Sequence, residues 1–263
     1  MRLEHHQGWN IPPDAPFYPN LPATYRDVKF HFIFFRARPE AVHDFLPEPL
    51  EASSDGMCVA SGMEIPFCSA YGPFLEAFVM LKCRFRQQEG YYCSHAFHNG
   101  PAGIAAGREI YGTPKVFAQI SVRKEERAMV TEAVMGGCRV LQISSVADQM
   151  ASPKAMHRLT PAWRLKLIPR ADRPEPAIKQ LIDCSNTTRD QVVHYFARGH
   201  GVVDFAASPY IDLTPLKPLS YEDAFYMESS YSEHYAEVIY DYLVPGRSAK
   251  SKAGKNARER RRG

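Results

Sequence analysis

Short runs of apolar residues recur along the chain, separated by glycine, proline and charged residues. Runs of this length, bounded by turn residues, are typical of β-strands. The predicted strands cover residues 28–36, 57–65, 75–85, 90–98, 116–122, 128–134, 138–146, 163–169, 178–183 and 201–207. Residues 236–243 fit a strand or a helix, and residues 39–47, which begin and end with proline, predict a short helix.

The spacing of these runs indicates an antiparallel sheet system that closes into a barrel or a sandwich. Gly136 and Gly137 separate two runs and predict a hairpin turn. The chain shows no strand-helix alternation over its length, which argues against a doubly wound nucleotide-binding fold. We therefore predict a mainly β (α+β) protein with a few peripheral helices.

The two ends of the chain differ from its middle. Residues 1–24 are rich in proline and predict an arm, residues 25–244 predict a single domain, and residues 245–263 predict a basic tail. The last 17 residues hold eight Lys or Arg and one Glu, which gives them a net charge of +7. Because the whole chain has a net charge of +3, the remaining residues carry −4. The tail has no apolar residue larger than Ala and no aromatic residue, so we expect it to be disordered and to bind no specific nucleic acid.

The sequence also limits the cellular setting. No stretch of about 18 apolar residues is present, so we predict no transmembrane helix and no role in a membrane. The polar N-terminus lacks the apolar segment of a signal peptide. Six cysteines without a CxxC pair predict reduced thiols, and together these features predict a cytoplasmic protein.

One segment, "GREIYGTPKVF" at 107–117, holds a candidate nucleophile. Lys115 follows Pro114 at the entrance of a predicted strand, and alternation places Phe117 on the same face. A lysine attacks a carbonyl only as the free amine, which requires its ordinary pKa of about 10.4 to be lowered by burial or by a second cation. From the residues alone, Lys115 is either such an amine or an ordinary structural lysine. His95 and His98 face opposite sides of their strand by the same alternation, so no metal site is predicted.

Several segments resemble the acetoacetate decarboxylase family. "IAAGREIYGTPKVF" at 104–117 is similar to the family's catalytic-lysine segment. The blocks "FLPEPLE" (45–51), "YGPFLEAF" (71–78), "PAWRLKLIP" (161–169) and "AEVIYDYL" (236–243) follow the family's order, so the resemblance covers roughly residues 25–244.

The resemblance implies an antiparallel closed β-barrel with a lysine inside it. By position, Lys115 takes the Schiff-base role and Glu76 falls on the family's active-site glutamate. Such a lysine forms an imine that serves as the electron sink, so no cofactor is implied. The resemblance also implies a small-molecule keto acid as substrate and a homo-oligomer. Arg108 and Glu109 are expected to support the lysine.

Four positions depart from the family pattern. Val116 stands where decarboxylases place a second lysine, and Thr113 replaces an aromatic residue. Val28 aligns with an arginine, and Arg26 is the nearby candidate to substitute for it. Ser61 aligns with a second acid, while Glu64 should face the other way. We therefore predict Arg26, Ser61 and Phe117 as substrate-binding residues.

The resulting hypothesis is a Schiff-base lyase that acts on a keto acid. Decarboxylation of acetoacetate or a related 3-oxo acid comes first, and an imine-based aldolase-dehydratase or hydratase acting on 2-oxo acids is the second reading. A protein of another class, which binds a hydrophobic keto-acid-like ligand without turnover, is the third.

Overall fold

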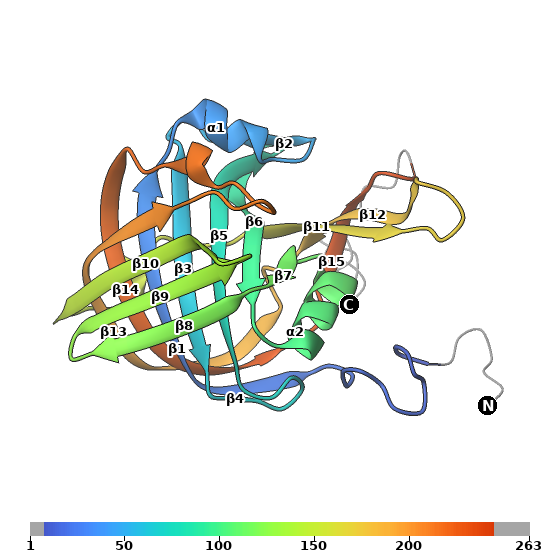
Figure 1. The fold of residues 1–263 in the computed structure, drawn as a ribbon, viewed down its shortest axis with the longest axis horizontal. Helices are drawn as coiled ribbons and strands as arrows, with labels where there is room; N and C mark the ends of the chain where they lie inside the picture. The colour runs from blue at the N-terminus through green and yellow to red at the C-terminus, as the bar shows by residue number, and fades with distance from the viewer. Residues whose placement is uncertain (1–7, 245–263) are drawn as a thin grey trace, which may run out of the picture.

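The computed structural model describes residues 8–244 and shows a chain dominated by β-strands (Figure 1). The strands are β1 (Ala23–Arg36), β2 (Leu50–Ala52), β3 (Met57–Ile65), β4 (Phe67–Cys68), β5 (Phe74–Phe85), β6 (Gln88–His98), β7 (Lys115–Phe117), β8 (Gln119–Glu125), β9 (Ala128–Met135), β10 (Cys138–Met150), β11 (Ala162–Pro169), β12 (Pro176–Asp183), β13 (Thr188–Phe205), β14 (Ser220–Glu233) and β15 (Glu237–Asp241). The helical segments are α1 (Pro39–Asp44), α2 (Pro101–Ala106), the π-helix η1 (Gly107–Tyr111) and two short 3₁₀ turns, Pro153–Ala155 and Thr214–Leu216.

The strands of the described region form one sheet with the order β15-β12-β11-β6-β5-β3-β1-β14-β13-β10-β9-β8. Neighbouring strands pair antiparallel, except that β6 pairs parallel with β7 and with β11. The predicted mainly β architecture is confirmed. The pairing within residues 8–244 runs as an open path from β15 to β8, so the closure of the predicted barrel is not shown.

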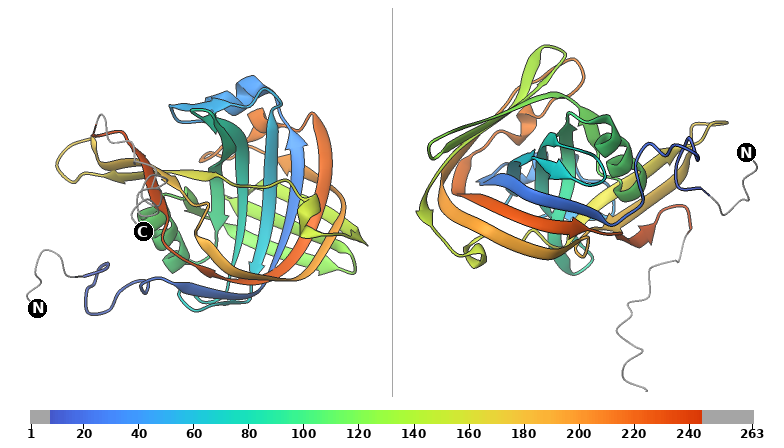
Figure 2. Two further views of the ribbon diagram at one scale, coloured as in Figure 1. Left: turned by 180° about the vertical axis from the view of Figure 1, so that it is seen from behind. Right: turned by 90° about the horizontal axis from the view of Figure 1, so that it is seen from below.

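The sheet curls so that each of its faces encloses a core. Strands β8, β9 and β10 fold across β3 and β5, and the long strands β13 and β14 curve around the molecule (Figure 2). On β1, Phe30, Phe32 and Phe34 belong to one buried cluster, while Ile33 and Phe35 belong to the other. Burial on both faces explains why the sequence of β1 is an almost continuous apolar run.

Most predicted strands are present, and the differences have local causes. Within residues 236–243, Glu237–Asp241 form the strand β15. Gly136 and Gly137 form the predicted hairpin turn, both with positive φ. Strand β14 was not predicted, because Ser and Glu interrupt its apolar residues even at inward positions such as the buried Ser229. The segment 101–111, for which no helix or strand was predicted, forms α2 and η1.

The proline-rich arm lies against the domain as far as it is described. Trp9 packs edge-on against Tyr18 and Tyr235, and the Tyr18 hydroxyl donates a hydrogen bond to Glu109. The basic tail, residues 245–263, and residues 1–7 lie outside the described residues. Within residues 8–244 no helix has the length and apolarity needed to cross a membrane.

A buried imidazole, His31, should make stability depend on pH. Its ring nitrogens contact Ser145 Oγ and Thr131 Oγ1, each at 2.8 Å, and burial lowers its pKa to about 3. Below pH 6.5 the unfolded chain binds a proton that the folded chain does not. The contribution of neutral His31 to the free energy of unfolding is therefore fully present above pH 6.5. It decreases as the pH falls, by about 2 kcal/mol between pH 6.5 and pH 5.

The variant His31→Gln should flatten this dependence without removing it, because His95 and His98 also have a pKa lowered to about 4 by burial. Urea unfolding of both proteins at pH 7 and pH 5 measures the difference. An equal loss of stability in the variant and the wild type would show that His31 is not the titrating group.

Candidate active site

Lys115 enters a cavity because the chain turns sharply just before it. η1 ends at Gly112, whose φ of 73° favours glycine, and Pro114 leads directly into β7. β7 pairs with the end of β6, which places Lys115 opposite Ala96. The lysine side chain lies in the wall of the cavity with 12% of its surface exposed. The structure thus places the candidate amine in a largely buried environment.

The lysine side chain runs directly over Gly107. A Cβ atom at Gly107 would lie 2.7 Å from Lys115 Cδ and 2.9 Å from Cε. This close approach explains in physical terms why glycine suits the segment "GREIYG".

The substitution Gly107→Ala should therefore move the amine while leaving the fold intact. The clash is with the flexible end of a side chain, so the melting temperature should change by less than a few degrees. Because catalysis depends on position, turnover should fall by about 10²-fold. Thermal unfolding and a steady-state assay of the same sample test this. Unchanged turnover would mean that Lys115 need not occupy the observed position.

Glu76 is the direct partner of the amine. Lys115 Nζ lies 2.9 Å from Glu76 Oε2 and donates a hydrogen bond to it. The glutamate side chain is also largely buried, at 10% exposure. The ring of Phe74, two residues earlier on β5, lies 5.6 Å from the amine. The carboxylate is therefore the nearest acceptor for a proton that Lys115 must lose before it attacks a carbonyl.

His98 completes this group, although no pattern in the sequence indicated that it would lie beside Glu76. It pairs with Glu76 across β5 and β6, and its Nε2 lies 4.0 Å from Glu76 Oε2. The N–H of Gly100 donates to His98 Nδ1, so the neutral ring carries its proton on Nε2. Burial, and then the nearby Lys115 charge, lower its pKa to about 4. At neutral pH His98 is thus an uncharged donor that faces the carboxylate.

A second acid, Glu233, lies at the end of β14. It is buried beside the cavity and accepts a hydrogen bond of 2.8 Å from the Tyr25 hydroxyl. Burial raises its pKa, although the charges of Lys115 and Arg164 act in the opposite direction. Burial thus makes Glu233 a weaker acid than an exposed glutamate.

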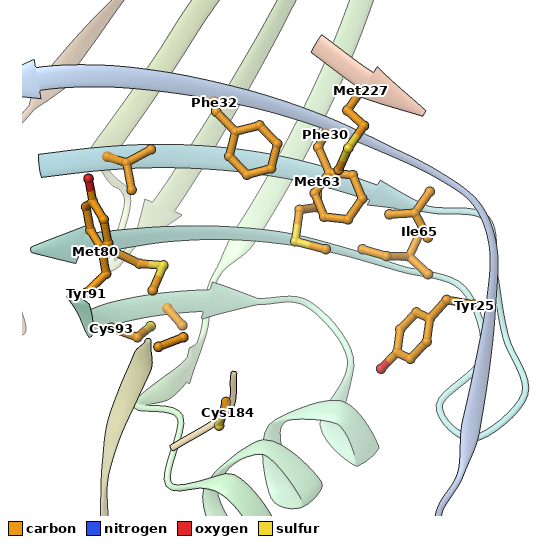
Figure 3. Packing of buried hydrophobic residues seen from close by; sticks show 14 of the residues in the cluster. Tyr25, Phe30, Phe32, Met63, Ile65, Met80, Tyr91, Cys93, Cys184 and Met227 are labelled. Carbon is orange, nitrogen blue, oxygen red and sulfur yellow. The ribbon is translucent and has the colours of Figure 1, made fainter. Parts of the chain in front are cut away.

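The remaining cavity wall is mostly apolar. The cavity has a volume of about 530 Å³. Its apolar lining includes Phe30, Phe32, Met63, Met80, Phe196 and Met227. Figure 3 shows Phe30, Met63 and Met227 close together, and Cys93 and Cys184 on the side of the cavity nearer the helix. A cavity of this size fits the roughly 300–1,000 Å³ range of small-molecule sites.

Arg164, on β11, also lines this cavity and was not predicted. Its Nε and Nη1 atoms are buried and have no hydrogen-bond partner. The sequence alone did not single it out, because "WRLKL" alternates like an ordinary half-exposed strand.

None of the three predicted substrate-binding residues, Arg26, Ser61 and Phe117, lines the cavity. A β-bulge interrupts β1 at Asp27, which has a φ of 53°, and shifts the register between Tyr25 and Val28. As a result, Arg26 faces outward over the ring of Phe67, whereas Val28 is fully buried. Arg26 therefore cannot take the place of the arginine that the family pattern has at position 28.

Phe117 is 63% exposed. It lies at the end of the three-residue strand β7, where the cavity has already ended, so strand alternation was not sufficient to place it.

The other predicted residues are close to the site in different ways. Ser61 is fully buried on the strand face that carries Met63, and its hydroxyl has no hydrogen-bond partner. Glu64 faces the other side, as expected, and forms an ion pair with Lys29. Arg108 donates a hydrogen bond of 3.2 Å to the backbone oxygen of Lys115, whereas Glu109 contacts the arm through Tyr18.

The position of Val116 shows what the loss of the family's second lysine means for the site. It packs against the core cluster on the opposite face of the sheet from the cavity. A lysine at this position would leave the strand away from Lys115, so its replacement by valine removes no charge from the cavity wall. Thr113 lines the cavity and accepts a backbone hydrogen bond from Lys115.

The residues of the site offer no evident metal centre. Within residues 8–244, no three His, Cys, Asp or Glu side chains are grouped so as to hold a metal ion. The two histidines of β6 lie on opposite faces, with His95 against Phe45 and His98 against Phe74. The arrangement provides instead an amine, the carboxylate of Glu76 and a second acid, Glu233, in one cavity, with His98 Nε2 4.0 Å from Glu76.

Comparison with known proteins defines the class to which this site belongs. The sequence profile of the acetoacetate decarboxylase (ADC) family matches residues 7–243, and the chain therefore belongs to that family. An acetoacetate decarboxylase of Clostridium botulinum is 26% identical over 257 residues, which cover 92% of this chain and 99% of that protein.

Solved structures support the same fold. The acetoacetate decarboxylase of Legionella pneumophila superimposes with a TM-score of 0.80 at 20% identity, covering 93% of this chain and all of that one. The enduracididine biosynthesis enzyme MppR, complexed with pyruvate, superimposes with a TM-score of 0.76 at 20% identity, covering 89% and 98% of the two chains. The same fold thus occurs in an acetoacetate decarboxylase and in an enzyme solved with pyruvate.

Proposed function

We propose that the protein is a Schiff-base lyase that decarboxylates a 3-oxo acid through Lys115. The observation that carries this proposal is the buried contact of 2.9 Å between Lys115 Nζ and Glu76 Oε2 inside a cavity of small-molecule size. A charge-assisted hydrogen bond of this kind positions the amine and gives it a route for its proton.

The reaction begins when Glu76 accepts a proton and the free amine of Lys115 attacks the ketone carbon. Loss of water forms a carbon–nitrogen double bond, which is protonated to an iminium ion. The bond to the carboxylate carbon then breaks, carbon dioxide leaves, and the electron pair moves to the nitrogen to give an enamine. Protonation of the enamine carbon and hydrolysis release the ketone and the lysine.

The buried groups around the amine fit these proton transfers. The neutral His98 carries its proton on Nε2, which lies 4.0 Å from Glu76 Oε2 and makes no hydrogen bond to any described residue, so it is close enough to respond to a shift of the carboxylate during the reaction. Glu233, whose pKa is raised by burial, is a candidate for the acid that protonates the enamine carbon. One acceptor and one donor on different strands suit a reaction that first removes and later adds a proton.

A second candidate reaction is an imine-based aldol condensation and dehydration of a 2-oxo acid. The fold shared with MppR, which was solved with pyruvate, favours this alternative. Both reactions start with the same imine and differ in whether the substrate carboxylate is lost.

The experiment that tests the proposal combines trapping with product analysis. The protein is incubated with acetoacetate, with longer 3-oxo acids or with pyruvate, and borohydride is added before the intact mass is measured. Decarboxylation predicts a reduced adduct and release of carbon dioxide from the 3-oxo acids. An adduct with pyruvate but no release of carbon dioxide from any acid would favour the second reaction. The absence of an adduct with every acid would contradict both.

A further inference from the structure

The guanidinium group of Arg164 is an unpaired charge in the cavity wall. Its Nε and Nη1 atoms are buried without a hydrogen-bond partner, while the residue as a whole is partly exposed. Among residues 8–244, no carboxylate lies within ion-pair distance of the group. A buried charge without a partner is strongly disfavoured, so this geometry fits a group that receives an anion from a ligand.

The surroundings keep this group charged and place it near the amine. Burial lowers the pKa of Arg164, but Cys184, Cys93, Glu233 and Glu76 together raise it above its ordinary value. The charge of Lys115 also lowers the pKa of two of these residues, Cys93 and Glu233. Arg164 and Lys115 therefore lie in the same electrostatic cluster, one on β11 and the other on β7.

We propose that Arg164 binds the carboxylate of the keto acid whose carbonyl reacts with Lys115. A guanidinium binds a carboxylate through charge-assisted hydrogen bonds, and no described residue accepts a hydrogen bond from Nε or Nη1 of Arg164. This role falls to β11 because Val28 is apolar and the bulge at Asp27 turns Arg26 outward. The inference rests on the proposed imine chemistry only in naming the ligand as a keto acid.

The binding of the carboxylate gives the site its selectivity for acids. A neutral ketone reaches Lys115 without using Arg164, whereas a keto acid is held at two points, by its carboxylate and by its carbonyl. Arg164 thus discriminates between acidic and neutral carbonyl compounds, and it restricts the separation of carboxylate and carbonyl that the site accepts.

The test compares borohydride trapping of acetoacetate and pyruvate with trapping of acetone. In Arg164→Met the half-saturating concentration of the acids should rise by about 10- to 100-fold, while that of acetone should change by less than about threefold. Arg164→Lys should lie between the wild type and Arg164→Met. Lys166→Met is the matched control, because it removes a cation from the same strand outside the cavity lining.

An equal effect of Arg164→Met on the acids and on acetone would overturn the proposal and show a merely structural role. If Arg164→Met does not fold, Arg164→Lys provides the same comparison. Binding of butyrate, measured by calorimetry, separates this proposal from the imine chemistry because butyrate has no ketone. Butyrate should bind to the wild type at least tenfold more tightly than to Arg164→Met, even if no adduct forms with any ketone. Equal butyrate affinity would contradict the inference.

Discussion

The variant Lys115→Arg should lose covalent trapping of every keto acid and at least about 10³-fold in turnover. Arginine keeps a positive charge beside Glu76 and so limits the damage to the fold. Its guanidinium is not a nucleophile at neutral pH and cannot form the imine. Borohydride trapping with intact-mass measurement, followed by peptide mapping of the wild-type adduct, checks both the loss and the site.

A matched control for this variant is Lys82→Arg. Lys82 is also partly buried and ion-paired, with Asp55 at 2.9 Å, but it lies outside the cavity. It should retain wild-type trapping and turnover. An adduct that persists in Lys115→Arg would assign the imine to another lysine and would remove the main support for the proposed reaction.

The variant Glu76→Gln should separate formation of the imine from its turnover. Glutamine keeps the shape of the side chain and can still accept a hydrogen bond from Lys115, but it cannot take up a proton. A positioned acid or base contributes about 10²- to 10⁴-fold, so turnover should fall by that range. The adduct should still form when the incubation before borohydride is long. Stopped-flow rates and end-point trapping of the same preparation measure the two effects.

Glu64→Gln serves as the control for that experiment. Glu64 lies on the adjacent strand β3, one residue from Met63 of the cavity wall, and faces Lys29 on the other side of the sheet. Its replacement removes one carboxylate without touching the site. Equal losses of turnover in the two variants would indicate a general effect of charge rather than proton transfer by Glu76.

Sequence reasoning predicted the strands and the candidate pair of Lys115 and Glu76, each for a different physical reason. The apolar runs of β3 and β5 follow from burial on both faces, and the alternation of β9 follows from burial on one face, which is why these strands lie nearly at their predicted bounds. Lys115 and Glu76 became candidates only through the resemblance to a family, since a single lysine after a turn carries no chemical signal of its own.

The rest of the site depends on features that a linear pattern does not contain. The bulge at Asp27 changes which side of β1 faces the cavity, and this reversed the prediction for Arg26. Arg164 and Glu233 reach the cavity because β11 and β14 approach it from distant parts of the chain. His98 acquires its role from the backbone N–H of Gly100, which fixes its tautomer.

The distribution of the cavity groups along the chain has a consequence for how new activities arise on this scaffold. Glu76, His98 and Lys115 come from one continuous stretch, β5 to β7, whereas Arg164 and Glu233 come from β11 and β14. In the proposed mechanism, the residues that form the bond to the substrate and the residues that select the ligand are thus encoded in separate parts of the chain. Mutations in the later strands therefore provide a route to diversify substrates while the inherited amine and its acid remain unchanged.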